Sequence, residues 1–278
     1  MHVPGQYHTT PFMSRDQLMK AAPTLFAERP AEHISARYKF ASTSLVLDEL
    51  AEAGWGAVKV MAKRANKEEN IGFEKHVVRM RKLDQQPVLQ GEILPELILT
   101  NSHNGDTAFR FDAGIYRLVC SNGLTVASAS VASARLIHTK YDSGAAIEAA
   151  STVAATFDNA IDLVERMRNR KIGHLEAVEF ARESMLVRYG ERDCDEEGNE
   201  RAHWPFEPER LFRLQRRSDD TTTLWNTFNV VQENLVRGGI RGINAAGDRT
   251  TSRGIKSVQT LMDVNTRLWT LAENALNN

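Results

Sequence analysis

The chain has 278 residues and a net charge of −1, so its overall charge does not single out a nucleic-acid-binding protein. Its 42% hydrophobic and 26% charged residues are typical of a globular protein, and it lacks an apolar run of the roughly 20 residues that span a bilayer. The polar start has no signal-peptide core. With only Cys120 and Cys194, a disulfide framework is not indicated. We therefore expect a cytoplasmic protein without a membrane segment.

Residues 1–42 are expected to form an N-terminal arm and a helix. Ser14 is followed three residues later by Gln17, the spacing of a capping box. The pattern predicts a helix that starts after Ser14 and ends before Pro23, because proline cannot continue a helix interior.

Residues 43–190 are expected to form an α+β core that begins with a helix ending at Gly54. Alternating apolar and polar side chains then predict an antiparallel meander of at least four strands between residues 55 and 127. In the first two strands the basic side chains alternate with apolar ones, which predicts one exposed basic face. This face would carry Lys59, Lys63, Lys75, Arg79 and Arg81.

A further strand and turn lie in FRFDAGIYRLVCSNGLTV, residues 109–126. The turn Ser121-Asn122-Gly123 suits a change of chain direction, because Asn and Gly tolerate positive φ. The strand places Arg110 and Arg117 near this turn, whose backbone N–H groups could bind a ligand. An ordinary sheet hairpin is the alternative interpretation.

The second half of the chain is expected to be helical. The spacing of Ile147, Ala150, Ala154 and Phe157 predicts one long helix over about 143–170 that crosses the apolar face of the meander. Residues 191–204 are acidic and are expected to form a solvated loop. Residues 205–278 are expected to form a helical C-terminal region.

An Arg/Gly-rich loop, RGGIRGINAAGDRTTSRGIK, separates the last two predicted helices. Asp248 is its only acid. Glycines let backbone N–H groups approach a ligand, and arginines bind phosphate through paired hydrogen bonds. We therefore expect a mobile phosphate-binding segment, in which the candidate residues are Arg237, Arg241, Arg249, Arg253 and Lys256.

Motifs for catalysis or metal binding are not found. The glycine-rich segment lacks the G-K-[ST] ending of a phosphate-binding P-loop, and neither GxSxG nor HExxH occurs. Cys194 and His203 have no second ligand at short spacing. We therefore predict no catalytic residues, no metal site and no cofactor, and we expect that the protein is not an enzyme.

Several segments resemble the phage- and plasmid-borne family catalogued as domain of unknown function 932. They are KHVVRMR, RLVCSNGL, LWNTFNVVQENLVRGG and SRGIKSVQTLMDVNTRLW, and the similarity extends from about Phe40 to the C-terminus. The resemblance implies a mobile-element setting, near genes for DNA replication and recombination. It implies no particular activity.

The predicted order of helix, meander and crossing helix is similar in outline to phage single-strand annealing proteins of the Red-beta and RecT kind, although no sequence motif matches. The similarity implies binding of single-stranded DNA and assembly into rings or filaments. We therefore predict a homo-oligomeric DNA-binding accessory protein of recombination or replication. The alternatives are a protein-binding module that blocks a host defence, and an enzyme that acts at the Ser121-Asn122-Gly123 turn.

Overall fold

The protein folds into two compact units, and the predicted α+β class is confirmed. The first unit contains residues 1–121 and 129–160, and the second contains 122–128 and 161–278. Among the described residues, no helix combines the length and apolar character needed to cross a membrane. The computed structural model describes residues 11–35, 38–88, 93–117, 125–126, 133–136, 144–191 and 204–277.

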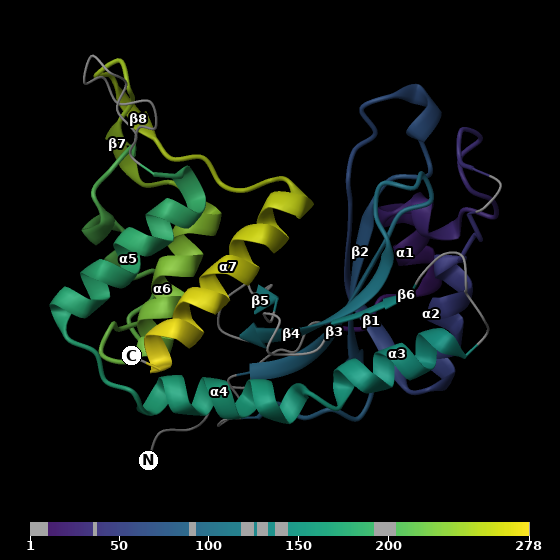
Figure 1. Cartoon of the computed structure of the whole chain (residues 1–278), viewed down its shortest axis with the longest axis horizontal. Helices are drawn as coiled ribbons and strands as arrows, with labels where there is room; N and C mark the ends of the chain where they lie inside the picture. Colours follow the sequence, from purple (N-terminus) through teal and green to yellow (C-terminus); the bar gives the residue numbers. More distant parts are fainter. Residues whose placement is uncertain are drawn as a thin grey trace. The chain divides into compact units, whose positions relative to one another are not determined.

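An antiparallel sheet forms the centre of the first unit (Figure 1). Strands β1 (Trp55–Ala62), β2 (His76–Lys82), β3 (Ile93–Asn101) and β4 (Phe109–Arg117) are neighbours in that order, which confirms the meander. A short 3₁₀ helix, η2 (Glu68–Asn70), lies between β1 and β2, and β6 (Ser133–Leu136) pairs with β4. The Cα partners Val78↔Leu99 and Leu99↔Phe111 show that one apolar face runs through three strands.

Helices cover this apolar face. They are α1 (Arg15–Ala21), η1 (Pro23–Phe26), α2 (Thr43–Glu52) and α3 (Ala145–Ala154). The predicted capping box is present at α1, because Ser14 Oγ accepts from the Gln17 backbone and the Gln17 side chain accepts from Ser14. In Figure 1, α2 and α3 lie along the sheet, in agreement with contacts of α2 with β1 and of α3 with β3, β4 and β6.

The predicted long helix is interrupted. It consists of α3 and α4 (Phe157–Asn169), which are separated at Ala155 and Thr156. Both the backbone N–H and the hydroxyl of Thr156 donate to the Val153 carbonyl, at 3.0 and 2.7 Å, so a three-residue turn replaces the helical pattern. The buried face of α3 is also offset from the predicted seam. It consists of Ala146, Ala149, Ala150 and Val153.

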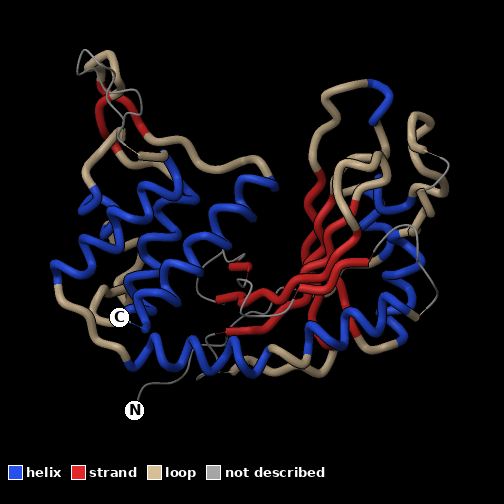
Figure 2. Tube along the Cα trace, viewed as in Figure 1, coloured by secondary structure: helices blue, strands red, loops and turns tan. Residues whose placement is uncertain are grey.

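The second unit is helical (Figure 2) and contains α5 (His174–Tyr189), α6 (Leu224–Arg237) and α7 (Val258–Asn277), together with residues 161–169 of α4. Helices α5, α6 and α7 pack on one another around Phe228, whose ring contacts Trp225 and Trp269. The 3₁₀ helix η3 (Pro208–Phe212) packs on α5 and α6, and β5 (Thr125–Val126) contacts α7. The predicted core ended at residue 190, but α5 belongs to the helical unit because it packs on α6 and α7.

Part of the Arg/Gly-rich segment forms a β-hairpin, which the sequence pattern did not predict. Its strands are β7 (Arg241–Ile243) and β8 (Arg249–Thr251), and it extends from the helical unit (Figure 2). Gly242 lies so close to the neighbouring chain that an added Cβ would be 1.7 Å from the Pro205 carbonyl oxygen. Ile243 N–H donates to the same oxygen at 2.9 Å. The glycine therefore serves a close backbone approach.

Candidate nucleic-acid interface

The predicted exposed basic face of the sheet does not exist. Lys59 and Lys63 are exposed, but Lys75, Arg79 and Arg81 are buried. Arg79 Nη2 and Arg81 Nε donate to Glu96 Oε1 of β3 at 2.8 and 2.7 Å. The two guanidiniums therefore neutralise a buried carboxylate, and a nucleic acid could not reach them from solvent in this arrangement.

Tyr116 of β4 completes what we call the buried charge cluster, which consists of Arg79, Arg81, Glu96 and Tyr116. The guanidinium carbons of Arg79 and Arg81 lie 4.4 and 4.8 Å from the centre of the tyrosine ring. The cluster links three adjacent strands. Lys59, opposite Arg79 in the register, has its pKa lowered by partial burial and by the charge of Arg79.

Arg110, another predicted residue of the sheet, pairs with a neighbouring acid. Arg110 is half-buried, and its Nε lies 2.9 Å from Asp112 Oδ2. Burial raises the pKa of Asp112, and the charge of Arg110 opposes this shift. The Arg117 side chain and the Ser121-Asn122-Gly123 turn lie outside the described residues.

The hairpin, in contrast, presents its basic side chains to solvent. The five predicted residues Arg237, Arg241, Arg249, Arg253 and Lys256 are all exposed. Ile243 pairs with Arg249 across the hairpin, and Arg241 is two residues from Ile243, so these three side chains share one face. Gly242 is on the opposite face, against Pro205.

Two arginines that the sequence reasoning missed lie beside the hairpin. Arg210 of η3 donates to the Arg241 carbonyl at 3.0 Å, and Arg213 donates to the Gly239 carbonyl at 3.5 Å. The run RLFRLQRR, residues 210–217, was the available signal, since four of its eight residues are arginine. We call Arg210, Arg213, Arg241 and Arg249 the hairpin arginine cluster.

This cluster lines two open grooves. One groove, of about 640 Å³, is lined by Arg210, Arg241 and Arg249 together with small and apolar residues, and none of its described lining residues is acidic. The other, of about 650 Å³, shares Arg210 and Arg241 and adds Arg213, Phe212 and Glu209. The surface between η3 and the hairpin can therefore hold an anionic ligand.

Arg237 and Arg253, two other predicted basic residues of this segment, lie outside the hairpin arginine cluster and contact other parts of the helical unit. Arg237 Nη1 donates to Glu233 Oε1 at 2.8 Å, and Arg216 also donates to this buried carboxylate. Arg237 is thus compensated within the protein and is a weak candidate for phosphate. The Arg253 carbonyl accepts a hydrogen bond of 3.4 Å from Arg188.

The described residues contain no group of three His, Cys, Asp or Glu side chains placed to hold a metal ion. A model of the family described as "Domain of unknown function (DUF932)" matches residues 30–269. The UPF0380 proteins YfjQ and YafZ of Escherichia coli (strain K12) are each 29% identical to the chain over 264 residues, which cover 95% of this chain and 92% of each relative. No solved structure matches.

Proposed function

Because the chain belongs to the DUF932 family, whose description names no activity, we propose a function from the geometry of its second unit. The hairpin arginine cluster binds the phosphates of single-stranded DNA, and the protein acts by binding, without catalysis. The observation that supports this proposal is the groove lined by Arg210, Arg241 and Arg249 among described residues that include no acid. We place this binding in the cytoplasm, in the recombination or replication of a mobile element.

The charge and the geometry of the cluster suit phosphate. Its four guanidiniums lie near two exposed carboxylates, Glu209 and Asp248, so positive charge dominates. Arginine binds phosphate oxygens through two parallel N–H donors. Arg210 and Arg213 each use one nitrogen to bond a backbone carbonyl, which restrains the side chain and leaves other N–H groups for a ligand.

An aromatic side chain beside the arginines favours a single strand over a duplex. The half-buried Phe212 lines the same groove as Arg210, Arg213 and Arg241. Single-strand-binding proteins combine a basic path for the backbone with apolar or aromatic side chains on which bases stack. In a duplex the faces of the bases are covered by stacking, so this apolar surface would have no partner.

A salt titration tests the proposal. Affinity for fluorescent single- and double-stranded oligonucleotides of matched sequence is measured by anisotropy over a range of salt. Replacing Arg210, Arg213, Arg241 and Arg249 by Gln should flatten the slope of log affinity against log salt by roughly 3, at about 0.7 per phosphate contact of a single strand. Binding should weaken equally for all sequences, because phosphate contacts carry no base information.

A matched control removes the same charge elsewhere. The exposed residues Arg29, Arg64, Arg135 and Arg166, all replaced by Gln, should leave the slope unchanged. An unchanged slope in the cluster variant would remove the hairpin from the DNA site. If the parent protein binds neither strand form at physiological salt, the proposed function is wrong, and a host protein becomes the partner to search for.

A further inference from the structure

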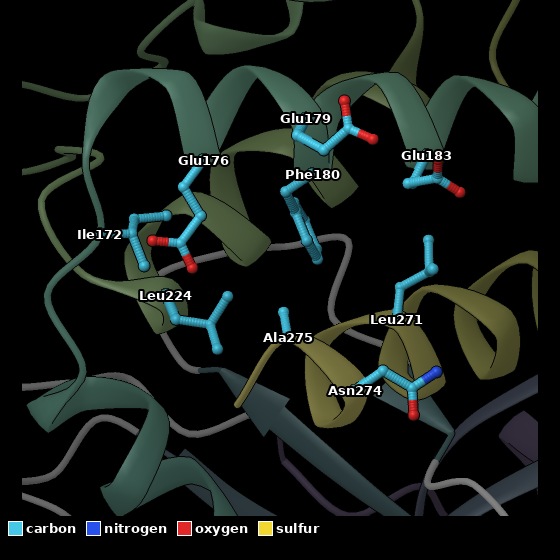
Figure 3. A pocket seen from close by; sticks show the side chains of 9 residues that line it. All are labelled: Ile172, Glu176, Glu179, Phe180, Glu183, Leu224, Leu271, Asn274 and Ala275. Atoms are coloured by element: carbon cyan, nitrogen blue, oxygen red, sulfur yellow. The ribbon is translucent and has the colours of Figure 1, made fainter. Parts of the chain in front are cut away.

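A third groove of the helical unit lies between α5 and α7 (Figure 3). It has a volume of about 300 Å³. The ring of Phe180 points into it from α5, and Leu271 and Ala275 of α7 face it from the other side (Figure 3). Its floor is apolar, and its α5 rim carries Glu176, Glu179 and Glu183.

The rim is acidic and adjoins exposed apolar surface. The three glutamates share one face of α5, at spacings of three and four residues. Arg170 pairs with Glu176, and Arg182 pairs with Glu179 and Glu183, which leaves one carboxylate in excess. Leu175, one turn from Glu179 on the same helix, is 85% exposed.

The solvent-facing side of the hairpin carries an apolar side chain between basic ones, which is complementary to the acidic rim and apolar floor of the groove. Ile243 is 53% exposed and lies between Arg241 and Arg249 on the face that points to solvent. An apolar side chain flanked by guanidiniums is complementary, in charge and in polarity, to an apolar floor flanked by carboxylates. Such opposite potentials orient two protein surfaces before they dock.

The hairpin cannot occupy the groove of its own chain. Its Gly242 is held against Pro205, and six residues separate Thr251 from Val258 at the start of α7, whereas Leu271 and Ala275 lie near the other end of that helix. At a rise of about 1.5 Å per residue, roughly 20 Å of helix separates Val258 from Leu271. The contact must therefore form between copies.

We propose that the β7–β8 hairpin of one copy docks in the α5–α7 groove of the next, so that the protein assembles head to tail. The occupant of the groove is thus a second copy of this chain. Because the two surfaces differ, a pair of copies still has one free hairpin and one free groove. A contact of this kind continues into a ring or an open filament.

This inference does not rest on DNA binding, although both use Arg241 and Arg249. The two ligands should compete for the hairpin, whereas the groove serves assembly alone. Groove variants therefore test assembly without touching the DNA site, and the failure of one proposal can be told from the failure of the other.

Charge reversal tests the docking. The full-length protein is measured by analytical ultracentrifugation over a range of concentrations. The variants Glu179→Arg with Glu183→Arg, and Arg241→Glu with Arg249→Glu, should each weaken association at least ~10-fold, which corresponds to about 1.4 kcal/mol. All four substitutions in one chain should restore assembly, and this rescue also shows that the variants fold. As a control, Glu68→Arg with Glu69→Arg on η2 should assemble like the parent.

A mixing experiment tests the head-to-tail order. Ala275→Trp fills the groove but keeps the hairpin, and Ile243→Asp disables the hairpin but keeps the groove. Each variant should be monomeric alone, and the mixture should form one-to-one pairs that grow no further. A parent protein that stays monomeric at its highest soluble concentration, or groove variants that assemble like the parent, would overturn the proposal.

Discussion

Glu96→Gln should strongly destabilise the first unit, because it removes the only carboxylate of the buried charge cluster. Glu96 is 1% exposed, and the side chains of Arg79 and Arg81 that donate to it are each 4% exposed. Glutamine has nearly the same shape, but it leaves two buried guanidiniums without a counter-charge and turns an NH₂ donor toward one of them. Removing one partner of a buried ion pair typically costs about 3–5 kcal/mol. A loss of this size is a large fraction of the ~5–15 kcal/mol that stabilises a typical protein.

Urea unfolding followed by hydrogen exchange of the amides in β2, β3 and β4 measures this loss in the unit that contains the cluster. The control is Asp48→Asn, which breaks the exposed Arg15–Asp48 pair and should cost no more than ~1 kcal/mol. A further variant combines Glu96→Leu with Arg79→Met and Arg81→Leu, and it should recover most of the stability, because apolar residues of similar volume avoid the desolvation of charge. If Glu96→Gln unfolds like Asp48→Asn, the carboxylate is not the buried counter-ion that we infer.

Three further results are expected. Gly242→Ala should push the hairpin away from Pro205 and lower the free energy of unfolding, measured by thermal unfolding, by about 1–3 kcal/mol. Gly247→Ala is the comparison. A Cβ at Gly247 would have nothing within 4 Å, so this substitution tests only the strain of the positive φ. Phe157→Ala should lower the stability by less than the roughly 3–5 kcal/mol typical of a fully buried phenylalanine, because Phe157 is half-buried against Trp55. Phe111, which is fully buried, is the comparison. If Phe157→Ala lowers the urea midpoint as far as Phe111→Ala does, this expectation is wrong. Acidification below pH 6.5 should destabilise the first unit through His76, measured as the free energy of unfolding in urea at several pH values.

Much of the fold follows from local patterns. Alternation identified the strands of the meander, and Ser14 with Gln17 identified the start of α1, because both signals depend on residues close in sequence. The break in the long helix was missed. It depends on the hydroxyl and N–H of Thr156 sharing the Val153 carbonyl, and periodicity carries no information about that bond.

The candidate site was predicted only in part, for a related reason. Alternation tells which side chains of β2 share a face, but not whether that face is covered. The useful signal was Glu96, the one charged residue of strand β3, which needs a buried cation as its partner. In the hairpin, composition identified Arg241 and Arg249, but Arg210 is brought beside them by tertiary packing.

The pH prediction depends on a histidine that is buried in its neutral form. His76 is 0% exposed, and its ring nitrogens lie 2.9 Å from Thr43 Oγ1 and 3.0 Å from the Glu74 carbonyl oxygen. Burial lowers the pKa of His76 from 6.5 to about 4, and the hydrogen bond to the carbonyl opposes this shift only in part. Between these two pH values the unfolded chain binds a proton that the folded chain does not.

The free energy of unfolding should therefore be constant above pH 6.5 as far as His76 is concerned, and it should fall as the pH decreases toward 4. The total loss is at most ~3.5 kcal/mol, at about 1.4 kcal/mol for each unit of pKa difference. Asp112, whose pKa burial raises, acts in the opposite direction, so the test is the difference between the parent and His76→Gln. The variant should be less stable at pH 7 and should lose less stability on acidification. Parallel stability curves for the two proteins would show that His76 does not carry the effect.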